Sequence, residues 1–397
     1  MNTDRPYQSR AIAKVREAYA GGSRAVCLVA PCGAGKTHLA EMICRTAKVP
    51  VLFLVHRIEL QEQAERRIPG VRVVTIQGLL SSGERPEAGI VIIDEAHHIV
   101  SQVWRTLADH YRASLIVGLT ATPERSDGTP LGDIFDHMVV AAKYSELIAG
   151  GWLVPAELFA PDKKQKTLAM SPLEAVAQYA DSRQSLIFSA TVGEARSLGA
   201  CVDGETPTEQ RKEIISRFRR GDLPTLASVY VLGEGFDVPD AGVAVLARGF
   251  GHTSTYLQAC GRVLRPSPGK TVGTVVDLVG SSLIHGTPDE DREYSLTGKA
   301  IRRSAKTAPL WQCKACGRCY PSSPPNRICP GCGHKIPEPQ ALVVARRQLR
   351  RKERDSMARP EEKAATYRAL VARAQNMGYK PAWAAQCFRG KYGHWPS

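Results

Sequence analysis

Ala30-Pro31-Cys32-Gly33-Ala34-Gly35-Lys36-Thr37 is the stretch that decides the fold of this chain. It follows the apolar run 25–29, which predicts a buried strand, and it precedes apolar residues at helical spacing. A strand, a glycine-containing turn and a helix that begins with Lys-Thr predict a phosphate-binding loop, although Ala30 stands where the strict pattern has Gly. An ordinary turn between a strand and a helix is the alternative.

The residue types of this loop suit a nucleoside triphosphate. Gly33 and Gly35 let the backbone N–H groups point at phosphate oxygens, and the helix N-terminus adds positive charge. Lys36 would reach the β- and γ-phosphates, and the Thr37 hydroxyl would bind Mg²⁺. We expect the rest of the loop to surround the nucleotide through Pro31, Cys32, Gly33, Ala34 and Gly35. Gln8 can pair a donor and an acceptor with an adenine edge, so we expect it to read the base.

Composition limits the classes of protein that this chain can represent. Its 397 residues suffice for two or three domains, and 43% of them are hydrophobic. No apolar run approaches the ~20 residues that span a bilayer. The N-terminus lacks the layout of a signal peptide. We therefore expect a cytoplasmic protein without a membrane partner, whose eleven cysteines are mostly reduced or bound to metal.

Positive charge is concentrated at the C-terminal end. Residues 299–397 contain 21 Lys and Arg against 5 Asp and Glu, a net charge of +16, whereas residues 1–298 contain 32 against 34, a net charge of −2. This distribution favours a near-neutral enzymatic part in residues 1–298 and a part that binds polyanions in residues 299–397. A solvated basic tail that aids solubility is the alternative.

A second candidate site follows the apolar run 89–93, in Asp94-Glu95-Ala96-His97. Two adjacent carboxylates after a buried strand are costly unless they have a task. Asp94 would hold Mg²⁺, directly or through water, and Glu95 would polarise the water that attacks the γ-phosphate. His97 would sense the nucleotide through a hydrogen bond. A solvated acidic turn is the alternative.

Other polar residues follow predicted strands. His56 and Arg57 come after the apolar run 51–55, where strands of open α/β sheets carry ligand contacts. Residues 71–77 predict another strand, in which Thr75 and Gln77 contact a phosphate backbone or simply lie at a strand edge; the two readings are evenly matched. We treat all four residues as candidate nucleic-acid contacts.

The phosphate loop, the DEAH sequence and Thr120-Ala121-Thr122 in this order resemble the first half of a superfamily 2 helicase or translocase of the DEAH-box type. The resemblance implies a second RecA-like domain that closes the ATP site. Residues 185–189, 231–239 and 258–266 resemble motifs of that domain. In the last of these, Arg262 and Arg265 lie three residues apart and would reach the same triphosphate. Gly235 and Asp237 would lie at the nucleotide, while Gly233 departs from the Thr or Ser common in relatives.

Paired cysteines mark the C-terminal third. Cys313, Cys316, Cys329 and Cys332 form two C-x-x-C pairs, which predict a tetrahedral zinc ribbon. Disulfides, plain buried thiols and an iron–sulfur cluster are weaker alternatives. Cys319 and His334 are spare donors. A basic, helix-favouring segment with interleaved aromatics follows, in which we expect Trp383 to be a core residue and leave the other aromatics open.

The fold class is therefore α/β, with two tandem RecA-like parallel-sheet domains. We expect domain 1 in residues 1–155, a linker in 156–172, domain 2 in 173–298, a zinc ribbon in 299–340 and a basic helical module in 341–397. The whole arrangement resembles bacterial RadD-like DNA-repair helicases and their phage-encoded relatives.

This resemblance implies an ATP-, Mg²⁺- and Zn²⁺-containing enzyme that acts on nucleic acid, DNA rather than RNA, in a bacterial or phage setting. Its role would lie in repair, recombination or replication, with proteins of those processes as partners. An RNA helicase, a non-motor nucleic-acid-binding accessory protein and a restriction-type motor subunit are the alternative functions.

Overall fold

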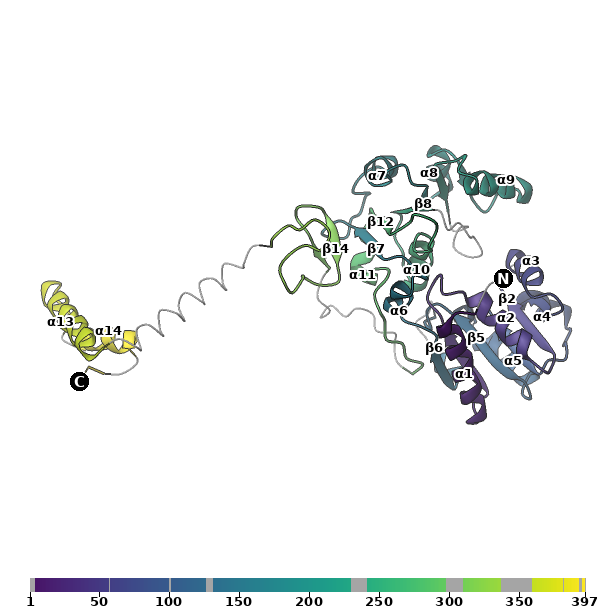
Figure 1. The fold of residues 1–397 in the computed structure, drawn as a ribbon, viewed down its shortest axis with the longest axis horizontal. Coiled ribbons are helices and arrows are strands. Elements are labelled where there is room, and N and C mark those ends of the chain that lie inside the picture. The colour runs from purple at the N-terminus through teal and green to yellow at the C-terminus, as the bar shows by residue number, and fades with distance from the viewer. Residues whose placement is uncertain are drawn as a thin grey trace. The chain divides into compact units, whose positions relative to one another are not determined.

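The computed structural model describes residues 4–56, 58–99, 101–125, 131–229, 241–297, 310–336, 359–380, 382–392 and 395–396 (Figure 1). The chain divides into two compact units, residues 1–323 and 324–397, and each is described by itself. Arg57, the segment 231–239 with Gly235 and Asp237, and the basic cluster within 341–358 lie outside the described residues.

The first sheet contains six parallel strands in the order β3-β2-β4-β5-β1-β6. These strands are β1 (Ala25–Val29), β2 (Val51–Val55), β3 (Arg72–Thr75), β4 (Ile90–Ile93), β5 (Leu115–Thr120) and β6 (His137–Val140). Most of them are continuous apolar runs because parallel sheets are covered on both faces. The strand β1 lies between β5 and β6, and the phosphate loop follows its carboxyl end. Ligands bind at this end of the strands in this class of fold.

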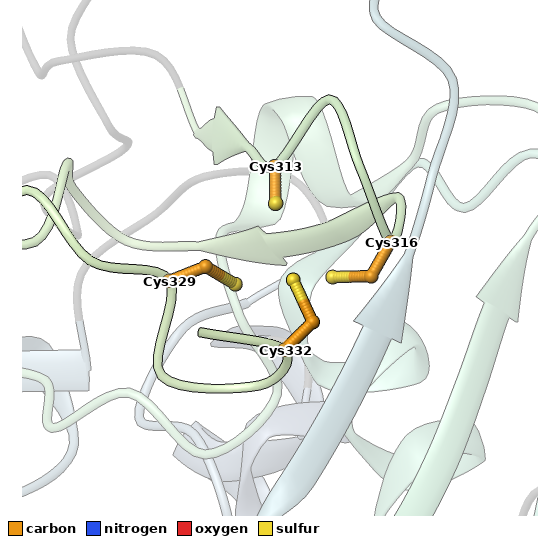
Figure 2. Close-up of side chains that lie close together, drawn as sticks. All are labelled: Cys313, Cys316, Cys329 and Cys332. Carbon is orange, nitrogen blue, oxygen red and sulfur yellow. The ribbon is translucent and has the colours of Figure 1, made fainter. Parts of the chain in front are cut away.

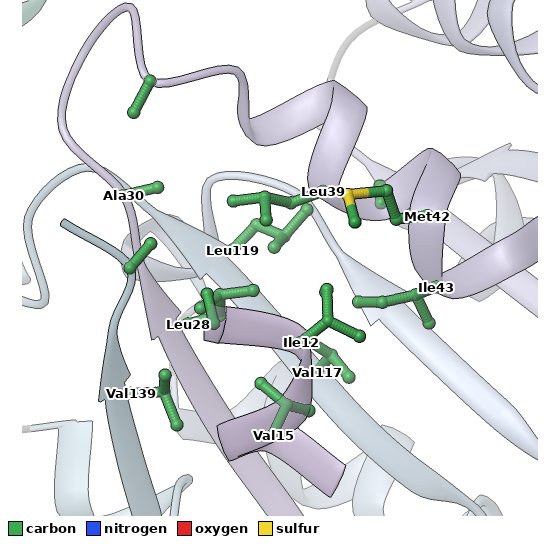
Figure 3. Close-up of a cluster of buried hydrophobic side chains, with 14 of the residues drawn as sticks. Ile12, Val15, Leu28, Ala30, Leu39, Met42, Ile43, Val117, Leu119 and Val139 are labelled. Carbon is green, nitrogen blue, oxygen red and sulfur yellow. The ribbon is translucent and has the colours of Figure 1, made fainter. Parts of the chain in front are cut away.

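Helices cover both faces of this sheet. In β1, Val26 and Leu28 belong to one core cluster, and Cys27 and Val29 to the other, because successive side chains of a strand point to opposite faces. The first cluster also takes residues from α1 (Pro6–Ala20), α2 (Lys36–Thr46), α3 (Ile58–Arg67) and α6 (Tyr144–Ala149). Figure 3 shows its centre, where side chains of α1 and α2 meet those of β1 and β5. The second cluster takes residues from α4 (Ile76–Ser82) and α5 (Ser101–His110). Two short 3₁₀ turns, η1 (Ala96–His98) and η2 (Leu131–Asp133), complete the domain.

One strand of the first domain ends earlier than expected. We predicted a strand over 71–77, but β3 ends at Thr75 and helix α4 begins at Ile76. The reason is local: the Thr75 hydroxyl accepts a hydrogen bond from the Gly78 N–H, 3.0 Å away, and so caps the helix.

The second sheet contains eight strands in the order β13-β14-β7-β12-β11-β8-β10-β9. They are β7 (Ala156–Phe159), β8 (Ser185–Ser189), β9 (Cys201–Val202), β10 (Thr225–Ser228), β11 (Val243–Ala247), β12 (Gly273–Asp277), β13 (Trp311–Gln312) and β14 (Arg318–Tyr320). One face is covered by α9 (Thr208–Arg219) and α10 (Thr253–Gly261), and the other by α7 (Pro172–Tyr179) and α8 (Val192–Ser197). The short helix α11 (Ser282–His285) follows β12. The expected α/β class with two parallel-sheet domains is confirmed.

Two expected boundaries differ from the strands. The predicted linker 156–172 begins with β7, which pairs in parallel with β12, so its first residues are part of the second sheet. The predicted zinc ribbon contains β14, which pairs antiparallel with β7. Cys319 of β14 lies in the core cluster of the second domain. A separate appendage was the wrong expectation for this hairpin, because it extends the sheet of the second domain.

The described part of residues 324–397 contains a pair of helices, α13 (Pro360–Asn376) and α14 (Ala382–Tyr392). Phe388 is the buried aromatic between them, and its ring packs against those of Tyr367 and Tyr392. Trp383 is only half-buried against Tyr379, so its expected place in the core was wrong. Among the described residues, no helix combines the length and the apolar character needed to cross a bilayer.

Candidate ATP site and four-cysteine site

The phosphate loop needs glycine at two positions. Gly33 has φ = 87° and Gly35 has φ = 81°, in the left-handed region that other residues rarely adopt. Space is also short: a Cβ on Gly33 would lie 2.7 Å from Cδ2 of Leu153, and one on Gly35 would lie 3.0 Å from Nε2 of Gln8. The loop thus has the curled backbone that phosphate binding requires.

Two side chains of helix α1 donate hydrogen bonds to this loop. The Tyr7 hydroxyl donates to the Ala34 carbonyl at 2.6 Å, and Gln8 Nε2 donates to the same carbonyl at 3.2 Å. Gln8 Oε1 accepts from the Arg5 N–H at 3.0 Å. An amide has two donors and two acceptor positions, so one of each is left on Gln8 for an adenine edge, which stays a prediction. The contact made by Tyr7 was not expected, because nothing local in the sequence distinguishes it from a core tyrosine.

Lys36 and Glu95 meet at the centre of the site. Lys36 Nζ lies 2.5 Å from Glu95 Oε1, with both side chains mostly buried. Burial acts against the charge of Lys36, but Glu95 and the nearby Asp94 more than offset it and hold the pKa of Lys36 above its ordinary value. The ammonium therefore stays charged at neutral pH and can exchange one anionic partner for another.

Glu95 lies in a strained backbone position. Its φ is 46°, in the left-handed region, although it is not glycine. Its backbone N–H donates to Asp94 Oδ1 at 3.0 Å. Non-glycine residues in this region cluster at functional sites, where surrounding contacts hold them. The tight turn brings both carboxylates to the carboxyl end of β4.

His97 connects this turn to the Thr-Ala-Thr segment. Its Nδ1 lies 3.0 Å from Thr120 Oγ1, and the Thr120 hydroxyl donates to the Thr122 carbonyl at 2.7 Å. The single hydroxyl proton is used there, so Nδ1–H of His97 must be the donor to Thr120. The same Nδ1 lies 3.5 Å from Glu95 Oε2. His97 therefore lies between Glu95 and the end of β5.

The second domain reaches the loop through the end of α10. A Cβ built on Gly261 would lie 2.5 Å from Cβ of Cys32, and one built on Gly33 would lie 3.7 Å from Cγ of Arg265. Burial raises the pKa of the Cys32 thiol, and the charges of Lys36, Arg262 and Arg265 act in the opposite direction. The structure thus brings both predicted arginines to the loop that carries Lys36.

Gln258 of α10 is a further candidate donor that no motif pointed to. It lies three residues before Gly261 and therefore on the same side of α10. Its side chain is buried, and within the described part of the chain its Nε2 has no hydrogen-bond partner. A buried amide donor of this kind fits an acceptor-rich ligand such as a triphosphate. Thr37 and Asp94 supply oxygen donors, the ligands that Mg²⁺ prefers.

The candidate nucleic-acid contacts lie at the carboxyl ends of two paired strands, β2 and β3, in which Val55 is opposite Thr75. Thr75 is occupied as the cap of α4, and Gln77 is exposed in the first turn of that helix. His56 lies at the end of β2, with its ring 5.1 Å from that of His98. His56 is therefore next to the DEAH turn, and its role with nucleic acid stays a prediction.

The four paired cysteines come together as expected. The sulfur atoms of Cys313, Cys316, Cys329 and Cys332 lie within 4.8 Å of one another (Figure 2). Tetrahedral zinc with Zn–S bonds of about 2.3 Å needs sulfurs about 3.8 Å apart, so the set fits a four-thiolate metal site.

Both cysteine pairs have the same local geometry. Gly317 donates to the Cys313 carbonyl at 2.8 Å and Gly333 to the Cys329 carbonyl at 2.9 Å, and both glycines have positive φ. Neither spare donor belongs to the cluster: Cys319 faces the second core, where burial raises its pKa to about 11, and His334 is exposed.

Two family models match this chain, one in each motor domain. A family model described as "Type III restriction enzyme, res subunit" matches residues 2–87 and 71–125, and one described as "Helicase conserved C-terminal domain" matches residues 163–267. A "51.5 kDa protein" of Lactococcus phage (isolate 7-9) is 26% identical over 77% of this chain and 76% of its own length. "DNA 3'-5' helicase XPB" of Mycobacterium tuberculosis is 28% identical over 62% of this chain.

The chain spans only 56% of the length of that mycobacterial relative. Among solved structures, a fragment described as an HsdR subunit of a type I restriction enzyme from Vibrio vulnificus matches with a TM-score of 0.59 and 20% identity. The match covers 73% of this chain and 67% of the fragment and shows the fold. One family model matches the first domain and the other matches the second, and the structure joins the two domains at the phosphate loop. The chain therefore belongs to superfamily 2 of the helicases and translocases, whose members hydrolyse ATP.

Proposed function

We propose that the chain is a motor that couples hydrolysis of Mg²⁺-bound ATP to movement along DNA. The observation that carries this proposal is the meeting of two sets of charged residues at one loop. Lys36 and Glu95 come from the first domain, and Arg262 and Arg265 come from the second. A site divided between two domains responds to its nucleotide by opening and closing.

The ion pair of Lys36 with Glu95 defines the resting state of this cycle. Triphosphate oxygens compete with Glu95 for the Lys36 ammonium, and Gln8 faces the base. Thr37 and Asp94 would hold Mg²⁺, which neutralises phosphate charge when bound. Once released from Lys36, Glu95 is free to accept a proton from the attacking water.

Closure would complete the site from the other side. Arg262 and Arg265 would stabilise charge that develops on the transferred phosphoryl group, an effect worth about 10³–10⁵ in rate in comparable enzymes. Gly235 and Asp237 would join them at the nucleotide. His97 would report the state of Glu95 to Thr120, and repeated closing and opening would move the domains along a phosphate backbone.

DNA is the polymer that we favour. The mycobacterial relative is named a DNA 3'-5' helicase, and the basic excess of residues 299–397 suits any polyanion. His56, Arg57 and Gln77 are the candidate contacts in the first domain, with Thr75 as the cap that orients α4. We place the protein in DNA repair, recombination or replication in a bacterium or its phage, with proteins of those processes as partners.

Zinc is the metal that we propose for the four cysteines. Four thiolates in two C-x-x-C-Gly turns match a closed structural site, in which the metal has no open position for chemistry. The pairing of β7 with β12 and with β14 also supports a division into domains. We propose that residues 1–155 and 156–297 form the two motor domains and that residues 310–320 supply edge strands of the second.

The test is ATP hydrolysis measured without polymer and with single-stranded DNA, duplex DNA, forked DNA and RNA. The proposal predicts stimulation by DNA that exceeds stimulation by RNA, and loss of turnover in Lys36→Ala. Equal or greater stimulation by RNA would identify an RNA-directed motor. Absence of turnover under all conditions would favour a non-motor binding protein.

A motor subunit of a larger enzyme is the second candidate. The family model of the first domain is described by a restriction enzyme subunit. This candidate predicts DNA-stimulated ATP hydrolysis by the isolated chain without strand separation, so a strand-displacement assay on the same preparation distinguishes it from a self-sufficient helicase.

A further inference from the structure

Gly261, at the end of α10 in the second motor domain, lies against Cys32 in the phosphate loop of the first. We propose that these two are positioning residues: the absence of a side chain at 261 lets the end of α10 settle on Cys32, and this contact sets how far the domains close. The inference rests on the proposed motor function and adds to it the element that fixes the position of Arg262 and Arg265.

The steric case depends on backbone-near atoms. A Cβ at position 261 would lie 2.5 Å from Cβ of Cys32, a separation that real Cβ atoms essentially never show. Neither atom is the far end of a flexible side chain. The overlap can be relieved only if one backbone moves, because packed interiors leave no free space.

The phosphate loop cannot easily supply that movement. Tyr7 and Gln8 both hold the carbonyl of Ala34, two residues after Cys32. The buried side chain of Tyr144 also lies next to the backbone of Cys32. The loop is therefore held at Cys32 and at Ala34 by helices of the first domain.

The end of α10 is held equally well by the second domain. A Cβ on Gly273 of β12 would lie only 2.2 Å from the Val263 carbonyl, so the chain just after α10 lies directly on that strand. Tyr256, Leu257 and Cys260 of α10 are buried in the core of the second domain. Any side chain at 261 would therefore separate the domains rather than deform one of them.

A substitution at 261 separates this effect from folding. Gly261 is helical and is absent from the residues with positive φ, so alanine fits its backbone. Alanine is favoured over glycine in a helix by about 1 kcal/mol. Gly261→Ala should thus leave α10 intact while it holds the domains apart. Displacement of catalytic groups by about 1 Å lowers rates by about 10²-fold.

The contact also predicts a rescue. In Cys32→Gly combined with Gly261→Ala, the new Cβ loses its clash and faces the Cα of residue 32, 3.8 Å away, which is ordinary van der Waals contact. In the double variant the Cβ atom at this contact belongs to residue 261, whereas in the wild type it belongs to residue 32. Closure should return even though both residues have changed.

The experiment measures kcat, the equilibrium affinity for ATP and the thermal midpoint in five proteins: wild type, Gly261→Ala, Cys32→Gly, the double variant and Gly193→Ala. Gly193 is a helical glycine of the second domain with nothing within 4 Å of its Cβ position, so it is the matched control. We expect kcat of Gly261→Ala to fall about 10²-fold with ATP affinity unchanged, since Lys36 and Thr37 belong to the first domain. The double variant should recover to within about threefold of Cys32→Gly.

Two results would overturn the inference: a kcat of Gly261→Ala equal to that of Gly193→Ala, or a loss in Gly261→Ala that the double variant does not recover. If Gly261→Ala lost activity through misfolding, Cys32→Gly would not restore it, so misfolding would give the second result. Failure of the motor function itself looks different, because the wild type would then hydrolyse no ATP with any polymer.

Discussion

Neutralising Glu95 should strengthen ATP binding while it stops turnover. In the structure the carboxylate of Glu95 lies 2.5 Å from the Lys36 ammonium, and both side chains are shielded from solvent. A triphosphate must compete for the same ammonium. Glu95→Gln keeps a hydrogen-bond acceptor at that place but removes its charge, so the competition weakens.

The size of the effect follows from the bond that is lost. Hydrogen bonds to charged groups contribute about 1.5–3 kcal/mol and are about twice as strong as neutral ones. The substitution therefore favours the phosphates by about 1 kcal/mol, or about fivefold in the dissociation constant. Loss of the general base should lower kcat by about 10²–10⁴.

The assay is equilibrium binding of a fluorescent ATP analogue, followed by single-turnover hydrolysis on the same preparations. Asp109→Asn is the control, because it neutralises an exposed carboxylate of α5 that pairs with Arg112. Weaker or unchanged ATP binding in Glu95→Gln would refute the competition between Glu95 and the phosphates. Turnover close to that of the control would refute the role of Glu95 as base.

Four further predictions concern the loop, the metal, the tail and pH. Lys36→Ala should abolish ATP turnover and leave Glu95 as an uncompensated charge, so its thermal midpoint should also fall; an active variant contradicts the site. Purified protein should contain one zinc per chain by elemental analysis. Because β14 pairs with β7, removal of the metal by a chelator should lower the thermal midpoint of the second domain. An unchanged midpoint after chelation would exclude a structural role for the metal. A chain that ends at residue 340 loses 13 Lys and Arg against 4 Asp and Glu, so its DNA affinity should fall and depend less steeply on salt, with basal ATP hydrolysis retained; an unchanged salt slope would show that DNA is held elsewhere. Burial raises the pKa of Asp289, whose carboxylate accepts from the Ala156 N–H at 2.9 Å, so its charge costs stability above the folded pKa and nothing below the unfolded one; Asp289→Asn should stabilise the protein at pH 7, and the gain should vanish below about pH 4 in thermal melts.

The tail truncation shows why the sequence alone misplaces a boundary. The sequence predicts residues 299–340 as an appended module, and on that basis removal of everything after residue 298 would be a clean test of DNA binding. In the structure this cut would remove β13 and β14 and take Cys319 out of the second core. Nothing local reveals that, because Cys319 and its pairing partner Leu158 lie far apart in the chain.

The sequence by itself determined the features that a few neighbouring residues dictate. Strands 25–29 and 51–55 are where continuous apolar runs predicted them, because parallel strands are buried on both faces. The curl of the phosphate loop needs only Gly33 and Gly35, and each cysteine turn needs only its own spacing and glycine. These are matters of backbone conformation and periodicity, which act over a few residues.

Only the tertiary structure decided which distant groups meet. The ion pair of Lys36 with Glu95, the hold of Tyr7 on the phosphate loop and the contact of Gly261 with Cys32 each join segments that are remote in the chain. Such contacts depend on how whole helices and sheets pack, and close packing fixes them to fractions of an ångström. That is why an ordinary helical glycine in the sequence becomes, in the folded protein, a point at which the two motor domains touch.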